Sequence, residues 1–177
     1  MRNFIFDKLE GSLVELSLFT QSDITQEYIS WLNDFNVVKF SNQRFIKHDF
    51  DSCQNYLSTF EDNDNLFILI RTKKDKKAIG TMTAYYNKQH RVVDFGILIG
   101  DISEWGNGYG QDAWNSLISW ANEVNNIRKI TAGTVSTNFG MLKIIKKSGM
   151  TLEATKKRHE IVENKEVDVH YFCMFKS

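Results

Sequence analysis

The chain has no proline and only two cysteines among its 177 residues. Without proline, a Pro-rich linker is excluded, and the turns are left to glycine, asparagine and aspartate. The two cysteines, Cys53 and Cys173, stand far apart in the sequence and do not make a disulfide framework. Such sparse use of cysteine is typical of a reduced protein, and we expect a cytoplasmic location.

Net charge is also absent, because 22 Lys and Arg residues balance 22 Asp and Glu residues. Broad binding to nucleic acid or to an anionic membrane needs a basic surface, so this balance argues against both partners. No apolar run approaches the ~20 residues of a membrane span. The first ten residues carry charges too early for a signal peptide. We therefore expect neither a nucleic-acid partner nor a membrane partner.

What the chain does contain is enough apolar material for one core. Hydrophobic residues make up 42% of it, with 13 Phe, 6 Tyr and 4 Trp. Its length is close to that of one domain, and it shows no internal repeat, low-complexity segment or linker. We therefore treat residues 1–177 as a single domain.

Apolar periodicity predicts a mixed order of elements: strand, two helices, three strands, helix, strand, helix and two strands. The predicted strands lie at 14–18, 66–70, 78–86, 91–99, 129–135, 150–160 and 166–175. The predicted helices lie near 24–32, 49–60, 113–124 and 141–147. This order is typical of a mixed α/β layer and not of a repeated βαβ winding.

The most informative motif lies within residues 94–113, where an apolar strand runs into a loop with Gly106, Gly108 and Gly110. An amphipathic helix follows at once. Glycine accepts positive φ and lets a ligand approach the backbone, while a helix N-terminus adds unpaired N–H donors. Together they predict an anion site, most often for phosphate. No Lys-Ser/Thr pair follows the glycines, as an NTP loop requires, and the Gly-x-Gly-x-Gly spacing lacks the βαβ setting of a dinucleotide site.

This loop resembles the pyrophosphate loop of the GCN5-related N-acetyltransferases (GNAT) in the residues Trp105-Gly106-Asn107-Gly108-Tyr109-Gly110. The similarity continues through 138–150 and covers most of the chain, from Val14 to Phe175. Trp105 and the sequence Trp31-Leu32-Asn33-Asp34 resemble most the branch of ribosomal-protein N-terminal acetyltransferases and bacterial amino-sugar acetyltransferases. The resemblance implies a single α/β domain with a mixed, mostly antiparallel sheet of about seven strands, flanked by about four helices.

The resemblance also implies acetyl-CoA as the co-substrate. The loop backbone would hold the pyrophosphate, and the strand before it would pair with the pantetheine arm and offer an N–H group to the thioester oxygen. Asn138 matches a family residue that touches the same arm. Three lysines of the last helix would meet the phosphates at the adenine end, with an ordinary solvated face as the alternative. The implied residues are Ile97, Leu98, Ile99, Trp105, Gly106, Asn107, Gly108, Tyr109, Gly110, Gln111, Asn138, Lys143, Lys146 and Lys147.

For catalysis the resemblance nominates Asp94. In the histone-acetylating branch a Glu on this strand deprotonates the amine, and Asp94 stands at the corresponding distance before Gly110. A mid-strand carboxylate is costly unless it has a partner or a task, and partial burial would raise its pKa toward that of a general base. A structural carboxylate is the alternative. Glu104 is a weaker candidate, more simply read as a charge on the loop surface. Ile145 stands where many members carry a Tyr that protonates the departing thiolate, so the general acid is not assigned.

The acceptor side of this fold is formed by the early helices, a hairpin and the C-terminal strands. The candidates there are Trp31, Asn33, Phe40, Arg44, Tyr85, His90 and Tyr171. For each aromatic the alternative is a place in the core, whereas Arg44 suggests a phosphate or carboxylate of the acceptor. His159 and His170 would be cross-strand neighbours if the last turn centres near Asn164. A metal site needs further ligands, and we expect no metal.

Three functions stay open on the sequence. The first is acetyl transfer from acetyl-CoA to the primary amine of an amino sugar, in particular a nucleotide-linked one. The second is an N-terminal protein acetyltransferase. The third is an acyl-CoA-binding protein without catalysis, which Ile145 favours and Asp94 opposes. The expected partner is a small-molecule amine, and a homodimer is left open.

Overall fold

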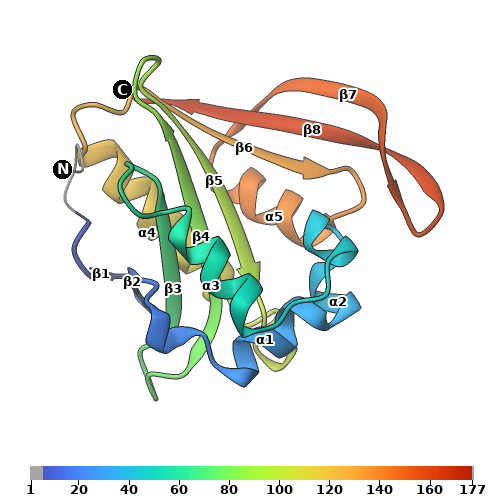
Figure 1. The fold of residues 1–177 in the computed structure, drawn as a ribbon. Helices are drawn as coiled ribbons and strands as arrows, with labels where there is room; N and C mark the ends of the chain where they lie inside the picture. Colours follow the sequence, from blue (N-terminus) through green and yellow to red (C-terminus); the bar gives the residue numbers. More distant parts are fainter. Residues whose placement is uncertain (1–5, 177) are drawn as a thin grey trace.

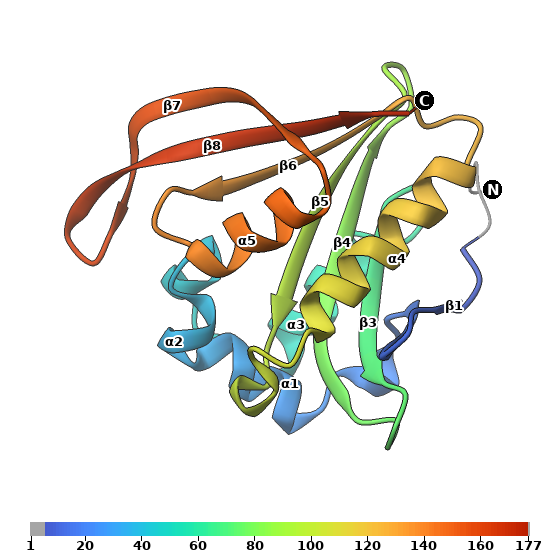
Figure 2. The same ribbon diagram turned by 180° about the vertical axis from the view of Figure 1, so that it is seen from behind.

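The structure, a computed structural model, describes residues 6–176. Within that range eight strands form one sheet in the order β1-β2-β3-β4-β5-β6-β8-β7, with helices on both faces (Figures 1 and 2). The strands are β1 (Leu9–Glu10), β2 (Val14–Leu18), β3 (Leu66–Thr72), β4 (Ala78–Asn87), β5 (Val92–Ile99), β6 (Lys129–Val135), β7 (Thr151–Val162) and β8 (Lys165–Phe175). The helices are η1 (Gln21–Asp23), α1 (Gln26–Asn33), α2 (Phe35–Val38), η2 (Asn42–Phe45), α3 (Phe50–Ser58), η3 (Ile102–Glu104), α4 (Tyr109–Glu123) and α5 (Phe139–Lys147).

The predicted order of elements is confirmed, and so is the mixed, mostly antiparallel sheet. Every neighbouring pair of strands is antiparallel except β5 and β6. Two of the elements that were not predicted from the sequence are short. β1, the eighth strand, has two residues, and the helix α2 has four. Such short elements carry too few residues for a periodicity to show.

The two faces of the sheet are covered by different helices. α4 packs on one face, where the fully buried Trp114 meets Phe95 edge-on with ring centroids 5.9 Å apart. α1 and α3 cover the other face, around Phe67 (Figure 1). Because side chains alternate along a strand, β5 sends Phe95 toward α4 and sends Asp94 and Gly96 toward the face of α3. One strand therefore serves two separate compartments.

β5 and β6 pair over only three positions, Val92 with Lys129, Val93 with Ile130 and Asp94 with Thr131. Beyond them β5 keeps its full pairing with β4, and β6 keeps its pairing with β8. Figure 1 shows the two strands diverging from their common end. The edge of β5 from Phe95 to Ile99 that faces β6 thus pairs with no other strand among residues 6–176.

α5 lies beside this opening and against α4 (Figure 2). The side-chain amide of Gln111 on α4 donates to the carbonyl of Ile144 at 3.3 Å. Ile145 is fully buried in the same core as Trp114. No helix within residues 6–176 has both the length and the apolarity to cross a membrane.

Gly100 fixes how α1 packs on the end of β5. Its N–H donates to the carbonyl of Ile79 at 2.9 Å, and a Cβ built on it would lie 2.1 Å from the ring of Trp31. Trp31 is buried in the core cluster of α1 and α3. The indole ring therefore occupies the space that a side chain at position 100 would need.

Gly100→Ala is expected to lower the free energy of unfolding by about 1–3 kcal/mol, because the added methyl overpacks the Trp31 ring. The measurement is urea denaturation of both proteins. Gly140→Ala is the matched control, since its Cβ would meet nothing closer than 3.7 Å and alanine favours the helix. Equal stability of the Gly100 and Gly140 variants would contradict this packing.

Candidate functional site

The glycine loop connects the open end of β5 to α4. Gly106 and Gly108 have φ values of +81° and +89°, a region that favours glycine. Gly108 is the N-cap of α4 and brings no capping side chain, so the first N–H groups of the helix are left without an intrahelical or side-chain partner. The Trp105 indole donates to the carbonyl of Ile99 at 2.9 Å and fixes the loop to the strand. The positive end of the α4 dipole therefore faces an open loop suited to an anion.

Glu104 does not stand free on the loop surface, as the sequence suggested. Its side chain is only 12% exposed, lies 3.6 Å from the Lys74 ammonium and accepts from the Asn107 amide at 3.1 Å. Lys74 also lies 5.7 Å from the ring centroid of Tyr109. Glu104 thus ties the β3–β4 turn to the glycine loop.

The remaining residues predicted for the donor lie around the same opening. Asn138 caps α5 by accepting from the Met141 N–H at 3.1 Å. Lys143 and Lys146 are exposed on α5 and take part in none of the ion pairs found within residues 6–176. Gln111 reaches toward α5, as described above. The structure therefore brings the loop, the unpaired edge of β5 and α5 together, while their roles toward coenzyme A stay predictions.

Asp94 stands at the last paired position of β5 before the opening. One carboxylate oxygen, Oδ1, accepts a hydrogen bond of 2.6 Å from the Thr131 hydroxyl on β6. Although solvent reaches the residue, surrounding protein atoms desolvate the carboxyl group and raise the pKa of Asp94 above its usual range. The Thr131 hydrogen bond acts in the opposite direction. A carboxylate with a raised pKa beside an open strand edge has the properties of a general base.

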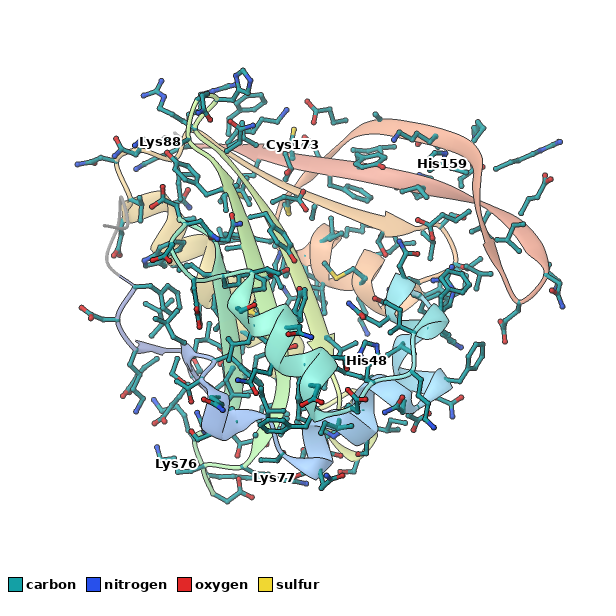
Figure 3. All side chains as sticks on the ribbon, in the orientation of Figure 1. His48, Lys76, Lys77, Lys88, His159 and Cys173 are labelled. Carbon is teal, nitrogen blue, oxygen red and sulfur yellow. The ribbon has the colours of Figure 1, made fainter. Side chains whose placement is uncertain are left out.

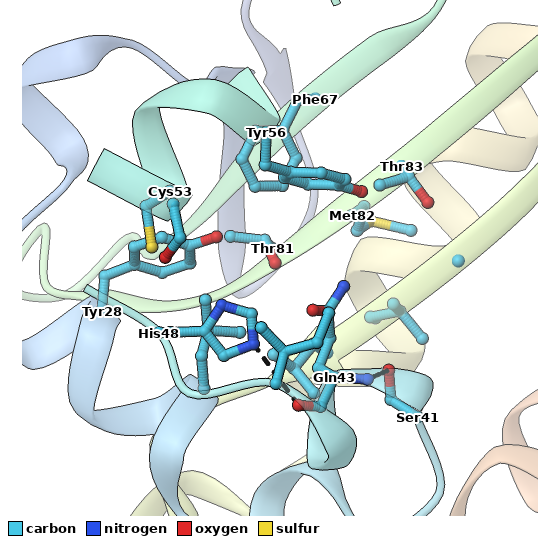
Figure 4. Close-up of a pocket in the computed structure, with 16 residues that line it drawn as sticks. Tyr28, Ser41, Gln43, His48, Cys53, Tyr56, Phe67, Thr81, Met82 and Thr83 are labelled. Carbon is cyan, nitrogen blue, oxygen red and sulfur yellow. Dashed lines mark hydrogen bonds between the residues drawn. The ribbon is translucent and has the colours of Figure 1, made fainter. Parts of the chain in front are cut away.

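A cavity of about 370 Å³ lies on the same face of the sheet, between β4 and β5 on one side and α1, η2 and α3 on the other (Figure 4). Its floor includes Thr81, Thr83 and Gly96. A Cβ at Gly96 would lie 2.7 Å from the Thr83 hydroxyl oxygen, so the glycine keeps the floor open. The lining residues are Tyr28, Leu32, Ser41, Gln43, Ile46, His48, Ser52, Cys53, Tyr56, Phe67, Thr81, Met82, Thr83, Gly96, Ile97 and Leu98.

The cavity lining carries no Asp, Glu, Lys or Arg. Burial raises the pKa of the Tyr28 and Tyr56 hydroxyls and of the Cys53 thiol, so all three stay protonated at neutral pH. What remains is a set of hydroxyl, amide and imidazole groups among aromatic rings. Such a wall can hydrogen-bond a polar ligand but offers no fixed negative charge to a polycation.

His48 is held in the cavity wall by the side chain of Asn33. The Asn33 amide oxygen accepts from the His48 N–H and its amide nitrogen donates to the His48 carbonyl, both at 2.9 Å. Figure 3 shows His48 beside the segment that joins α2 to α3, far from His159 on β7. Asn33, which was predicted on the acceptor side, thus does not line the cavity itself but holds the backbone of His48, which does.

The residues predicted for the acceptor are scattered. Trp31 is buried against Gly100 and does not line the cavity. The Arg44 side chain is 7% exposed and is already bound, 3.7 Å from Glu160 and donating to the Ser41 carbonyl at 2.7 Å. Trp31 thus takes the alternative place in the core, and Arg44 is engaged by groups of the protein itself and not by an anionic group of an acceptor.

Three other acceptor candidates lie on different strands and turns. Tyr85 on β4 contacts Tyr56 on α3 through their hydroxyls, 2.7 Å apart, at the edge of the cavity. Tyr171 on β8 packs across Gly133 of β6, whose Cβ would lie 3.4 Å from its ring. His90 lies in the β4–β5 turn, which Figure 3 locates by Lys88, at the end of β5 opposite to the glycine loop.

The two C-terminal histidines are not cross-strand neighbours, although the turn does centre on Glu163 and Asn164. His170 pairs with Thr155, whose hydroxyl lies 2.9 Å from its Nδ1. His159 falls in an irregularity between Lys156 and Glu160, where the register shifts. Among residues 6–176 no three His, Cys, Asp or Glu side chains lie together in a way that could hold a metal ion.

Comparison with known proteins decides the family. The profile of the acetyltransferase (GNAT) domain matches residues 14–151, most of the chain. The chain belongs to the GNAT acetyltransferase family. As a GNAT acetyltransferase it transfers an acetyl group from acetyl-CoA to an amine. No curated protein matches the chain significantly.

Solved structures with the same fold have low sequence identity to this GNAT chain. A spermidine N-acetyltransferase from Vibrio cholerae, bound to CoA and spermine, is 17% identical over 92% of this chain and 95% of its own, with a TM-score of 0.81. RimL, a ribosomal L7/L12 α-N-protein acetyltransferase bound to CoA, is 14% identical over 96% and 98%, with a TM-score of 0.81. The microcin C7 self-immunity acetyltransferase MccE, bound to acetyl-CoA and AMP, is 16% identical over 93% of each chain, with a TM-score of 0.78.

The raised pKa of Asp94 predicts a pH-dependent effect on stability. Ionisation of the Asp94 carboxyl group costs more free energy in the folded chain than in the unfolded one. This destabilisation is absent at pH values below the ordinary pKa of Asp and fully present at pH values above the raised pKa of the folded chain. Asp94→Asn is therefore expected to raise the Tm at about pH 8 and to leave it nearly unchanged at about pH 3. Asp62→Asn, in the α3–β3 turn, controls for the loss of one charge. A Tm gain that is the same at both pH values would contradict the burial argument.

Proposed function

We propose that this GNAT acetyltransferase acts on the primary amine of an amino sugar, in particular a nucleotide-linked one. The observation that carries the proposal is the cavity beside Asp94, which combines hydroxyl, amide and imidazole groups with aromatic rings and has no ionised carboxylate in its lining. Sugar hydroxyls fit such neutral hydrogen-bonding walls, and sugar or base faces stack on aromatic rings. Its volume of about 370 Å³ also falls in the range of small-ligand sites.

The donor side of the proposal rests on the opening between β5 and β6. An unpaired strand edge accepts an extended chain through main-chain hydrogen bonds, so residues 95–99 are suited to the pantetheine arm. The loop at 106–111 is suited to the pyrophosphate, since its glycines and the start of α4 present N–H groups to an anion. The donor would then enter along the opening, with its thioester close to the last paired position.

Asp94 acts in this scheme as the general base. Its carboxylate takes a proton from the acceptor ammonium, directly or through a water molecule, and the free amine attacks the thioester carbonyl. A backbone N–H of residues 97–99 stabilises the negative charge that develops on the carbonyl oxygen. The raised pKa suits the task, because a base that titrates nearer to neutral pH accepts a proton more readily.

Two alternatives make different demands on the acceptor cavity. A polyamine acceptor, as in the Vibrio cholerae relative, carries several positive charges that the lining does not balance. A protein N-terminus, as in the RimL relative, requires room for a peptide chain. An acyl-CoA-binding protein without catalysis agrees with the burial of Ile145 in the core, because no hydroxyl stands at that position.

A free-thiol release assay with acetyl-CoA distinguishes these functions. The panel contains amino sugars, nucleotide-linked amino sugars, spermidine and short peptides with free N-termini. We expect the highest kcat/KM for a nucleotide-linked amino sugar. A higher kcat/KM for spermidine or a peptide would overturn the proposed acceptor, and tight acetyl-CoA binding without turnover on any amine would favour the non-catalytic alternative.

Asp94→Asn is expected to lower kcat by about 10²–10⁴-fold, the usual contribution of a general base. The dissociation constant for acetyl-CoA, measured by calorimetry, should change little, because Asp94 holds the amine side of the reaction. The acid limb of the pH profile should disappear with the carboxyl group. Asp62→Asn serves again as the control. Turnover like that of the wild type in Asp94→Asn would remove this residue from the mechanism.

A further inference from the structure

The opening between β5 and β6 begins at a side-chain contact between the two strands. Asp94 and Thr131 form the last of the three paired positions, and their side chains lie on the same face of the sheet. The Thr131 hydroxyl donates to Asp94 Oδ1 at 2.6 Å and lies 3.4 Å from the Val93 carbonyl. The side-chain contact thus extends the strand pairing at the position where the backbone pairing stops.

The two oxygens of the Asp94 carboxylate differ in their surroundings. Oδ1 is engaged by Thr131, while Oδ2 takes part in no hydrogen bond or ion pair found among residues 6–176. Gly96, two residues further on the same face, lines the cavity. With one oxygen held from β6, the carboxylate cannot rotate freely, and its second oxygen stays available for a proton.

We propose that Thr131 is a positioning residue for the acetyl-transfer reaction: its hydroxyl fixes the Asp94 carboxylate at the point where β5 and β6 separate, so that Oδ2 is directed to the incoming amine. This inference rests on the proposed role of Asp94 as the base. Threonine and valine have the same branched shape and both suit a strand, so the hydroxyl is what distinguishes Thr131 from a purely structural residue.

The surroundings of Asp94 leave Thr131 as the group that acts on it directly. The charged or titratable residues nearest in register are Tyr85 on β4, Lys129 on β6, and Cys173 and Tyr171 on β8. Tyr85 is itself engaged by Tyr56 of α3, and Lys129 is paired with Glu153. None of these groups forms an ion pair with Asp94 among the described residues. A hydrogen bond to the charged form favours that form, so its removal should disfavour the ionised carboxylate.

The test is a carboxyl-carbon NMR titration of Asp94 in the full chain, which needs no acceptor. In Thr131→Val the Asp94 midpoint is expected to rise by about one pH unit, the size of one charge-assisted hydrogen bond. Thr131→Ser keeps the hydroxyl and should titrate like the wild type. Thr134→Val is the matched control, since Thr134 lies three residues on along β6, on the opposite face. Titration of Asp94 in Thr131→Val at the wild-type midpoint would overturn the proposal.

Kinetics with the acceptor found in the panel complete the test. In Thr131→Val the acid limb of kcat/KM should move upward with the NMR midpoint, while the dissociation constant for acetyl-CoA stays within about twofold. A purely structural role would change the Tm and leave the acid limb in place, which would overturn the positioning role. The proposed function fails separately, if Asp94→Asn keeps its kcat or if no amine is acetylated, because the titration reports on the Thr131–Asp94 contact in either case.

Discussion

The loss of strand pairing between β5 and β6 after Asp94 is the constraint on which the candidate site depends. A sheet normally satisfies its backbone groups by continuing the pairing, and here the pairing stops after three positions while β5 runs on to Ile99. The consequence is an unpaired edge in the middle of the sheet, not at its rim. α4 and α5 protect this edge on one side, and the glycine loop stands at its end (Figure 2). In the proposed scheme the donor lies along this opening, beside the cavity proposed for the acceptor.

The two faces of β5 lie in different surroundings, the hydrophobic core on one side and the candidate site on the other. On one face Phe95 packs against Trp114 in the main core, which fixes the strand rigidly. On the other face Asp94 and Gly96 border a hollow whose walls come from α1, η2 and α3. A single strand therefore sets the distance between Asp94 and the cavity floor, and regular structure holds such a distance more precisely than a loop does. The cavity wall at His48 belongs to the same construction, because the Asn33 amide group binds both the backbone N–H and the backbone carbonyl of His48.

Much of this arrangement could be predicted from the sequence, since the signals were local. The glycine spacing at 106–110, the apolar strand before it and the amphipathic helix after it belong to one continuous segment, and the structure forms each of them there. The acceptor cavity could not be found in this way, because three segments distant in sequence meet only in the fold. Thr81 and Thr83 alternate with buried residues of β4, and this polar alternation was the signal available for its floor. His159 and His170 failed because the register of the last hairpin is not fixed by periodicity: a His159–His170 pair would need Val162 opposite Val167, whereas Val162 pairs with Lys165, and a bulge in β7 then shifts His170 further, to Thr155.

Asp94 shows why the site departs from what would stabilise the sheet. Desolvation raises the pKa of its carboxyl group, so at neutral pH the charged form makes folding less favourable than a neutral residue would. Thr131 offsets part of that cost, but it engages only one of the two oxygens. Sequences depart from what stabilises a fold mainly at functional sites, and in the proposed scheme Asp94, at the start of the opening and two residues before Gly96 of the cavity floor, takes the proton of the amine.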